Sequence, residues 1–142
     1  MFWDSSAVIP VLIAEARSAE MVALLSSDRA PAMWWAAPVE CQSALHRRRR
    51  EKVLPAAALA EALARLDRLA EDVDVVAPTA RLRARAGRAL AAHPLRAADA
   101  LQLAAALVWA DDSPAGEPFV CLDGRLREAA SGEGFVVLPE FL

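Results

Sequence analysis

The chain has 142 residues, 56% of them hydrophobic, and 16 basic against 19 acidic side chains give a formal net charge of −3. This length suits one domain with a single buried core, and this composition excludes a disordered chain. The longest uncharged run, Ala100–Ala110, has only eleven residues, whereas a membrane span needs about 18. Because Asp4 interrupts the N-terminus and no basic segment precedes an apolar stretch, we expect no signal peptide and a cytoplasmic protein.

The first half of the chain predicts two short apolar strands and four helices. The strands are predicted over Phe2-Trp3 and Ala32–Trp35. The first helix can be capped by Ser5 and Ser6, and it tolerates Pro10 because proline falls near its first turn. The other helices are predicted over Ala19–Ser26, from Pro38 into an arginine tract, and from Pro55 along Leu59, Leu63, Leu66 and Leu69. The leucine spacings of four, three and three place these side chains on one helix face.

The second half alternates strands and helices in the same way. In chain order the predicted elements are a strand over Val73–Val76, a helix capped by Thr79 that ends near His93, a helix over Leu95–Trp109, a strand over Phe119–Leu122, a helix over Gly124–Ala130 and a strand over Phe135–Leu138. The helix over Leu95–Trp109 is apolar almost all round, which predicts a buried position. The whole pattern predicts one α/β domain over residues 1–142, with a parallel sheet and helices on both faces.

Four acids fall where such a sheet places its ligands. Asp4 and Asp123 directly follow predicted strands, and the carboxyl ends of parallel strands are the usual binding edge. Glu40 and Asp99 stand early in helices, from which a side chain can reach back over that edge. Each acid also has an ordinary explanation, because Asp4 and Asp123 can be N-caps and the other two suit the positive end of a helix.

Glu40 and Asp99 fit that ordinary explanation less well than the other two acids. Apolar residues follow each of them, and no basic residue except Arg96 is a clear partner. A buried carboxylate without a partner is costly. A divalent cation such as Mg²⁺, which prefers hard oxygen ligands and keeps several waters, would compensate these charges.

Four segments in chain order resemble the signatures of the PIN-domain family, and most closely those of its VapC-type ribonuclease toxins from bacterial toxin–antitoxin pairs. They are Met1-Phe2-Trp3-Asp4-Ser5-Ser6-Ala7, Val39-Glu40-Cys41-Gln42-Ser43-Ala44-Leu45, Leu95-Arg96-Ala97-Ala98-Asp99-Ala100-Leu101-Gln102-Leu103-Ala104 and Phe119-Val120-Cys121-Leu122-Asp123-Gly124-Arg125-Leu126. The resemblance spans the whole chain and implies a doubly wound sheet, commonly of five strands. One departure is Gln102, where many relatives have histidine.

The resemblance also implies a chemistry and a set of site residues. It places the family's metal-binding acids on Asp4, Glu40, Asp99 and Asp123, and its orienting hydroxyl on Ser6. Bound Mg²⁺ or Mn²⁺ would activate water and neutralise charge during hydrolysis of RNA phosphodiester bonds. We interpret Asp4 and Asp99 as the main metal ligands, Glu40 as holding the attacking water or completing the coordination, and Asp123 as holding a second or weaker metal.

Four carboxylates require positive charge nearby if RNA is to bind. Candidates are Arg47, Arg48, Arg49 and Arg50, then Arg81, Arg85 and Arg88 on one helix face, and Arg96 one turn before Asp99. The alternative for each cluster is a solvated helix face. Other residues that could suggest chemistry are expected to be ordinary: Trp34 and Trp35 in the core, His46 and His93 exposed, and Cys41 and Cys121 as buried reduced thiols.

The resemblance further implies partners, namely a cognate VapB-like antitoxin and a second copy of the chain in a homodimer. The Leu59–Leu69 helix and the first two helices are candidate docking surfaces, unless these leucines serve only the domain's own core. A dehalogenase-type phosphatase is excluded because Ser6 stands where its second aspartate is needed, and no glycine-rich phosphate loop exists. The remaining alternative is a catalytically silent PIN-like binding module that acts in a protein or RNA complex.

Overall fold

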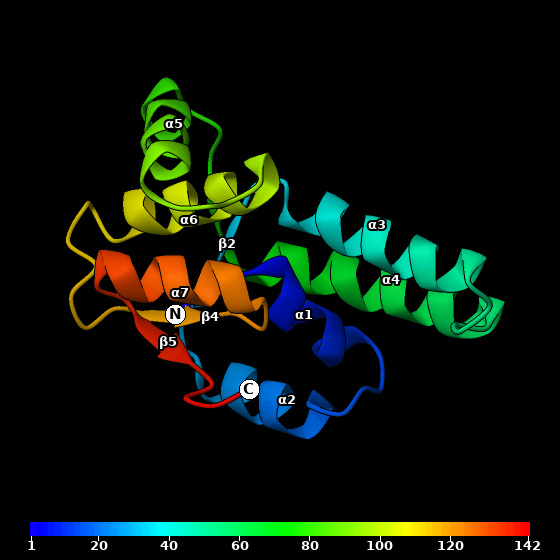
Figure 1. Cartoon of the computed structure of the whole chain (residues 1–142). Coiled ribbons are helices and arrows are strands. Elements are labelled where there is room, and N and C mark those ends of the chain that lie inside the picture. The colour runs from blue at the N-terminus through cyan, green and yellow to red at the C-terminus, as the bar shows by residue number, and fades with distance from the viewer.

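A computed structural model describes all 142 residues and contains one five-stranded parallel sheet (Figure 1). The strand order is β3-β2-β1-β4-β5, with β1 at the centre. The strands span Phe2–Trp3 (β1), Ala32–Trp34 (β2), Asp74–Val76 (β3), Pro118–Val120 (β4) and Val136–Leu138 (β5). In register, Phe2 lies opposite Ala32 on one side and Phe119 on the other. The predicted parallel sheet is therefore confirmed, and β1 and β2 end side by side.

Seven helices connect the strands and contact one another in two groups. They span Ser5–Leu12 (α1), Ser18–Ser27 (α2), Ala37–Arg50 (α3), Ala56–Asp72 (α4), Ala80–Ala92 (α5), Ala97–Trp109 (α6) and Gly124–Glu133 (α7). Helix α1 packs on α2, α3 and α4, whereas α6 packs on α5 and α7. Right-handed crossovers in this strand order place these two groups on opposite faces of the sheet. Figure 1 shows α3 and α4 extending together away from the sheet.

The core is built from the sheet and from side chains of all seven helices, and α6 is buried as its apolar sequence predicts. Phe2 stacks on Phe119 with ring centroids 5.6 Å apart, and Phe119 also contacts Phe135. Helix α6 is buried from Gln102 to Leu107. The chain's buried residues include only two that are polar or charged, Asp4 and Gln102. No helix is both long enough and apolar enough to cross a bilayer.

Several local predictions need correction. Asp4, and neither Ser5 nor Ser6, is the N-cap of α1, because its carboxylate accepts the N–H of Ser6. Pro10 lies in the second turn of α1 and not near the first, so an N–H is missing from the helix interior. Trp35 is 58% exposed, since β2 ends at Trp34 and the chain turns there. Leu95 precedes α6, which begins at Ala97.

Two further side chains differ from the sequence interpretation. His93 is half-buried and not exposed, because its Nε2 lies 2.8 Å from the Oε1 of Glu133. Leu66 of α4 is fully buried, and the other three leucines of its face, Leu59, Leu63 and Leu69, pack against the core. The structure thus favours the alternative in which this face serves the domain itself.

Candidate active site

Asp4 is fixed at the carboxyl end of the central strand. Its backbone N–H donates to the carbonyl of Val120 in β4, at 2.9 Å. Its Oδ2 accepts three hydrogen bonds, from the N–H of Ser6 at 2.9 Å, from the Ser6 hydroxyl, and from the thiol of Cys121 at 3.5 Å. The side chain is only 3% exposed. The other carboxylate oxygen, Oδ1, accepts none of these hydrogen bonds and is not fully buried. Oδ1 is therefore the oxygen of Asp4 that is available to a ligand.

Glu40 is held by a residue from the opposite helix layer. It lies in the first turn of α3, just beyond β2, and its Oε2 accepts a hydrogen bond of 2.6 Å from the Nε2 of Gln102 in α6. Asp99 stands three residues before Gln102 on the same helix, and residues at this spacing share a helix face. The hydrogen bond from Gln102 therefore places Glu40 of α3 beside the face of α6 that carries Asp99.

Electrostatic repulsion couples Asp4 to Glu40 and Glu40 to Asp99. The pKa of Asp4 is raised to about 6, mainly by burial and also by the charge of nearby Glu40, although hydrogen bonds from Ser6 and Cys121 lower it. Burial also raises the pKa of Glu40, and the charge of Asp99 adds to this, while hydrogen bonds from Gln102 and Ser5 oppose it. None of the ion pairs in the structure includes Asp4, Glu40 or Asp99. These three acids form an uncompensated acidic group.

Asp99 and Asp123 also take the capping roles considered from the sequence. Asp99 Oδ2 accepts the N–H of Arg96 at 3.3 Å, and Asp123 Oδ1 accepts the N–H of Leu126 at 3.0 Å as the N-cap of α7. Asp123 joins the rest of the site through Cys121, whose sulfur accepts its N–H at 3.3 Å and donates to Asp4. Asp123 is thus two residues from a side chain that contacts Asp4, but its carboxylate is engaged by its own helix.

The donor set suits a divalent cation, although the side chains do not form a ready-made cage. No three His, Cys, Asp or Glu side chains converge closely enough to hold a metal. Mg²⁺ needs only one or two carboxylates and keeps several waters. Asp4 Oδ1 and the Glu40 oxygen not bonded to Gln102 are hard oxygen ligands of this kind. Burial raises the pKa of both acids, and no basic side chain pairs with either. The residues therefore fit Mg²⁺ or Mn²⁺.

Sequence reasoning missed two members of this site. From the sequence, Gln102 was noted only because many relatives have histidine at that position, and Cys121 was interpreted only as a buried thiol. Both cysteines are indeed buried and free, and burial raises the pKa of Cys41 to about 12 and that of Cys121 higher still. One signal was available for Gln102, since a polar residue inside an otherwise apolar helix needs a partner. No local signal links Cys121 to Asp4.

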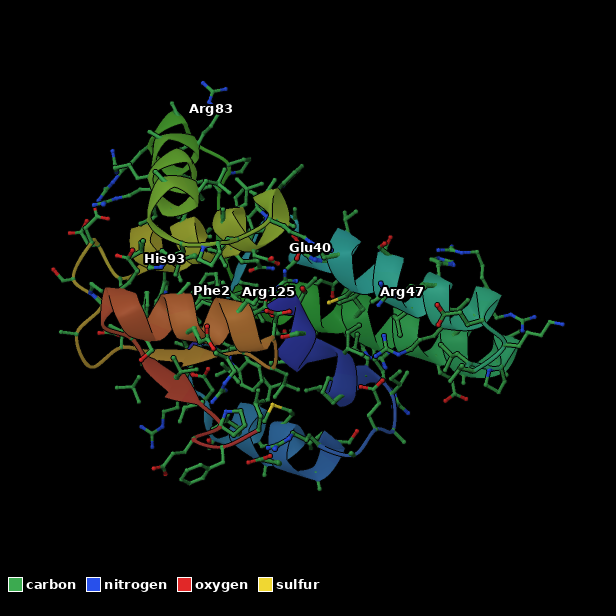
Figure 2. All side chains as sticks on the ribbon, in the orientation of Figure 1. Phe2, Glu40, Arg47, Arg83, His93 and Arg125 are labelled. Atoms are coloured by element: carbon green, nitrogen blue, oxygen red, sulfur yellow. The ribbon has the colours of Figure 1, made fainter.

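The predicted arginine clusters separate into paired and unpaired side chains. Arg48 forms an ion pair of 2.6 Å with Glu15, and Arg81 and Arg85 pair with Asp112. Arg47, Arg49 and Arg50 are exposed, as are Arg88 and Arg96, and none of these five is in an ion pair. Among the unpaired arginines of α3, Arg47 is the nearest in sequence to Glu40. Figure 2 shows Glu40 near the start of α3 and Arg47 further along the same helix.

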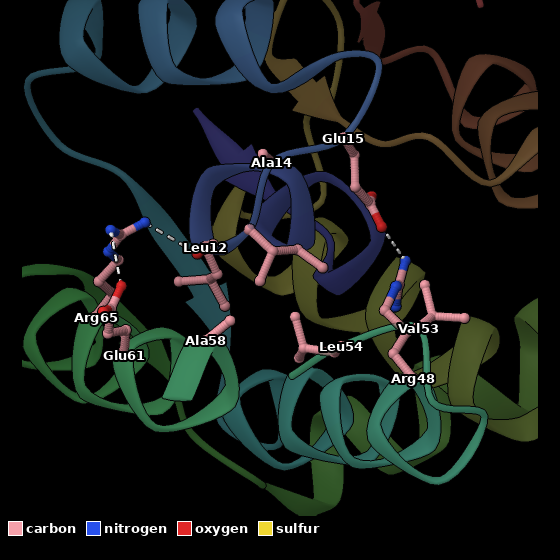
Figure 3. Close-up of a pocket in the computed structure, with 10 residues that line it drawn as sticks. Leu12, Ala14, Glu15, Arg48, Val53, Leu54, Ala58, Glu61 and Arg65 are labelled. Atoms are coloured by element: carbon pink, nitrogen blue, oxygen red, sulfur yellow. Dashed lines mark hydrogen bonds and ion pairs between the residues drawn. The ribbon is translucent and has the colours of Figure 1, made fainter. Parts of the chain in front are cut away.

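The acids do not line an enclosed cavity. A pocket of about 340 Å³ lies elsewhere, between the end of α1, the end of α3 and the start of α4 (Figure 3). Its floor includes Leu12 and Leu54, and its rim carries the Arg48–Glu15 and Arg65–Glu61 pairs. None of the four acids lines this pocket or any other.

Comparison with known proteins identifies a family and several similar structures. The family model described as "PIN domain" matches residues 1–130. A crystal structure of VapC20 from Mycobacterium tuberculosis, described as a toxin that cleaves the sarcin–ricin loop, superposes with a TM-score of 0.70 at 24% sequence identity, and the match covers 95% of each chain. No curated protein sequence matches. At this identity the structural match shows that the two chains share a fold.

Proposed function

Because the chain belongs to the PIN-domain family, we propose that it is a Mg²⁺- or Mn²⁺-dependent endoribonuclease and the toxin of a VapBC-type toxin–antitoxin pair. The observation that carries this proposal is the uncompensated pair of Asp4, at the end of β1, and Glu40, in the helix that follows the neighbouring β2, two carboxylates with raised pKa values. Similarity to an RNA-cleaving VapC toxin in fold supports the same conclusion. Such an enzyme would meet its RNA in the cytoplasm.

The proposed mechanism divides the work among the chain's own acids. A bound cation supplies Lewis acidity and lowers the pKa of water. Asp4 Oδ1 and Asp99 would hold it, with the Asp4 carboxylate kept in one orientation by Ser6 and Cys121. Glu40 would complete the coordination, and because its pKa is raised it is also suited to accept the proton of the attacking water. Asp123 would contribute only after giving up its bond to the Leu126 N–H.

A cleavage assay with the purified protein tests this function. RNA should stay intact in EDTA and be cut when Mg²⁺ or Mn²⁺ is restored, with inactive Asp4→Asn protein from the same preparation route as the control for contaminating nuclease. If RNA and Mn²⁺ both bind but no bond is cut, the alternative of a catalytically silent PIN-like binding module replaces the enzyme.

We further propose that Arg47 guides RNA toward the acids. Arg47 follows Glu40 by seven residues, which is two helical turns on one face and roughly 10 Å along the axis. Arg49 lies on nearly the opposite face of the same helix and is likewise exposed and unpaired, so it is a matched control.

Arg47→Gln is expected to weaken binding of single-stranded RNA and to reduce the salt slope of log K by about 0.7, the value for one lost phosphate contact. Arg49→Gln should leave both quantities close to wild type. Fluorescence anisotropy with a labelled RNA in EDTA, across a series of KCl concentrations, measures this. Equal effects of the two substitutions would instead indicate a diffuse influence of net charge, and Arg47 would lose its assigned role.

The proposed partners are a VapB-like antitoxin and a second copy of the chain. Both proposals rest on the resemblance to VapC-type toxins. Co-expression with the product of the neighbouring small reading frame should give a complex in which RNA cleavage is inhibited, and light scattering on the free protein should show a dimer. A monomer that forms no complex would contradict both assignments.

A further inference from the structure

Gln102 is a buried polar residue that core packing does not explain. Its side chain is 1% exposed, and its neighbours in α6 are apolar from Leu103 to Leu107. The Nε2 donates to Glu40 at 2.6 Å, but the Oε1 is buried and has no hydrogen-bond partner. An unpaired buried acceptor destabilises the folded state. Leucine or methionine would fill similar volume without that cost, so the amide is retained for a reason other than packing.

The chemistry of Glu40 fixes the orientation of this amide. An ionised carboxylate only accepts hydrogen bonds, so the NH₂ of Gln102 must face Glu40 and the carbonyl oxygen must point elsewhere. The amide therefore joins the acidic group on one side and presents an acceptor on the other. The Oε1 of Gln102 is a buried acceptor for which no protein group provides a donor.

We propose that Gln102 is a positioning residue of the active site, which holds Glu40 in one orientation through its Nε2. The inference rests on the proposed nuclease function. Gln102 touches neither the scissile bond nor the cation in this arrangement, and it acts by fixing one rotamer of Glu40. Apart from Gln102, only the Ser5 side chain donates a hydrogen bond to Glu40, and no basic side chain pairs with it.

The test compares Gln102→Met, which preserves volume but removes the hydrogen bond to Glu40, with Gln102→His at pH 8, where a neutral imidazole keeps one donor. Leu103→Met, one residue along the same buried helix, controls for a general disturbance of the core. Gln102→Met should weaken Mn²⁺ binding in calorimetry and lower kcat by 10- to 100-fold, the usual effect of losing such a supporting residue. KM for RNA should change little. Gln102→His and Leu103→Met should stay within about threefold of wild type.

A double substitution separates positioning from simple stability. If Gln102 acts through Glu40, then Gln102→Met should add almost nothing to the loss of Mn²⁺ affinity in Glu40→Gln protein. Additive losses, or a lower melting temperature of Gln102→Met with unchanged Mn²⁺ affinity, would overturn the inference. Because Mn²⁺ binding is measured without RNA, the result is decisive even if the protein proves not to cleave RNA. A wild type that binds no Mn²⁺ would overturn both this inference and the proposed function.

Discussion

Asparagine in place of Asp4 or Asp99 is expected to lower the rate of RNA cleavage at least about a hundredfold, the scale of losing one preorganised electrostatic contact, without changing the far-UV circular dichroism. The neutral amide has the same shape as the carboxylate but attracts a cation far less. Asparagine is also as good an N-cap as aspartate, so the bond from the Ser6 N–H to residue 4 can persist. Loss of activity would then report on charge and not on folding.

Two further substitutions make this experiment selective. Asp67→Asn removes an exposed, unpaired charge on α4 and should leave cleavage unchanged. Asp123→Asn should cause a smaller loss than the first two variants, because its carboxylate is already engaged by the Leu126 N–H and an amide oxygen can keep that bond. If Asp4→Asn and Asp99→Asn both cut RNA at the wild-type rate, the acids are helix caps and the proposed site is wrong.

The order and type of the elements could be predicted because each has a strong local signal. Pro38 and Pro55 mark the starts of α3 and α4, and Thr79 caps α5 as expected. The uniformly apolar sequence of α6 predicted its burial. Boundaries were less accurate because the strands have only two or three residues, too few for alternation to show which side chain faces outward. Trp35 was misplaced in the core for this reason.

Contacts between distant segments could not be predicted from local patterns. The Glu40–Gln102 bond joins residues 62 positions apart, and Cys121 lies 117 positions from Asp4. No periodicity within α3 or α6 specifies that these two helices meet at the acids. Likewise, the pairing of Arg48 with Glu15 depends on how α3 packs against the end of α1. Charge runs therefore identify candidate RNA contacts, but only the fold shows which of their members are already neutralised.

The buried charge of Asp4 should destabilise the metal-free protein in a pH-dependent way. Its pKa is about 6 in the folded chain against an ordinary 3.8, so the folded state binds more protons than the unfolded state between these values. Stability consequently falls as pH rises from 4 to 6, and above pH 6 the full penalty of roughly 3 kcal/mol is present. In EDTA at pH 8, Asp4→Asn should therefore melt at a higher temperature than wild type. The difference should vanish near pH 4, and Asp99→Asn, only half-buried, should gain less.

Addition of Mn²⁺ should reverse this order of stability. A cation that binds only the folded state adds RT ln(1 + [L]/Kd), which is about 4.1 kcal/mol at a thousandfold excess over Kd. This exceeds the penalty of roughly 3 kcal/mol at Asp4, so wild type should overtake Asp4→Asn during the titration, while the variant gains little. Differential scanning calorimetry at pH 8, with Asp67→Asn as the matched control, should show the two melting curves crossing. If Mn²⁺ raises both melting temperatures in parallel, Asp4 does not contribute to a cation site.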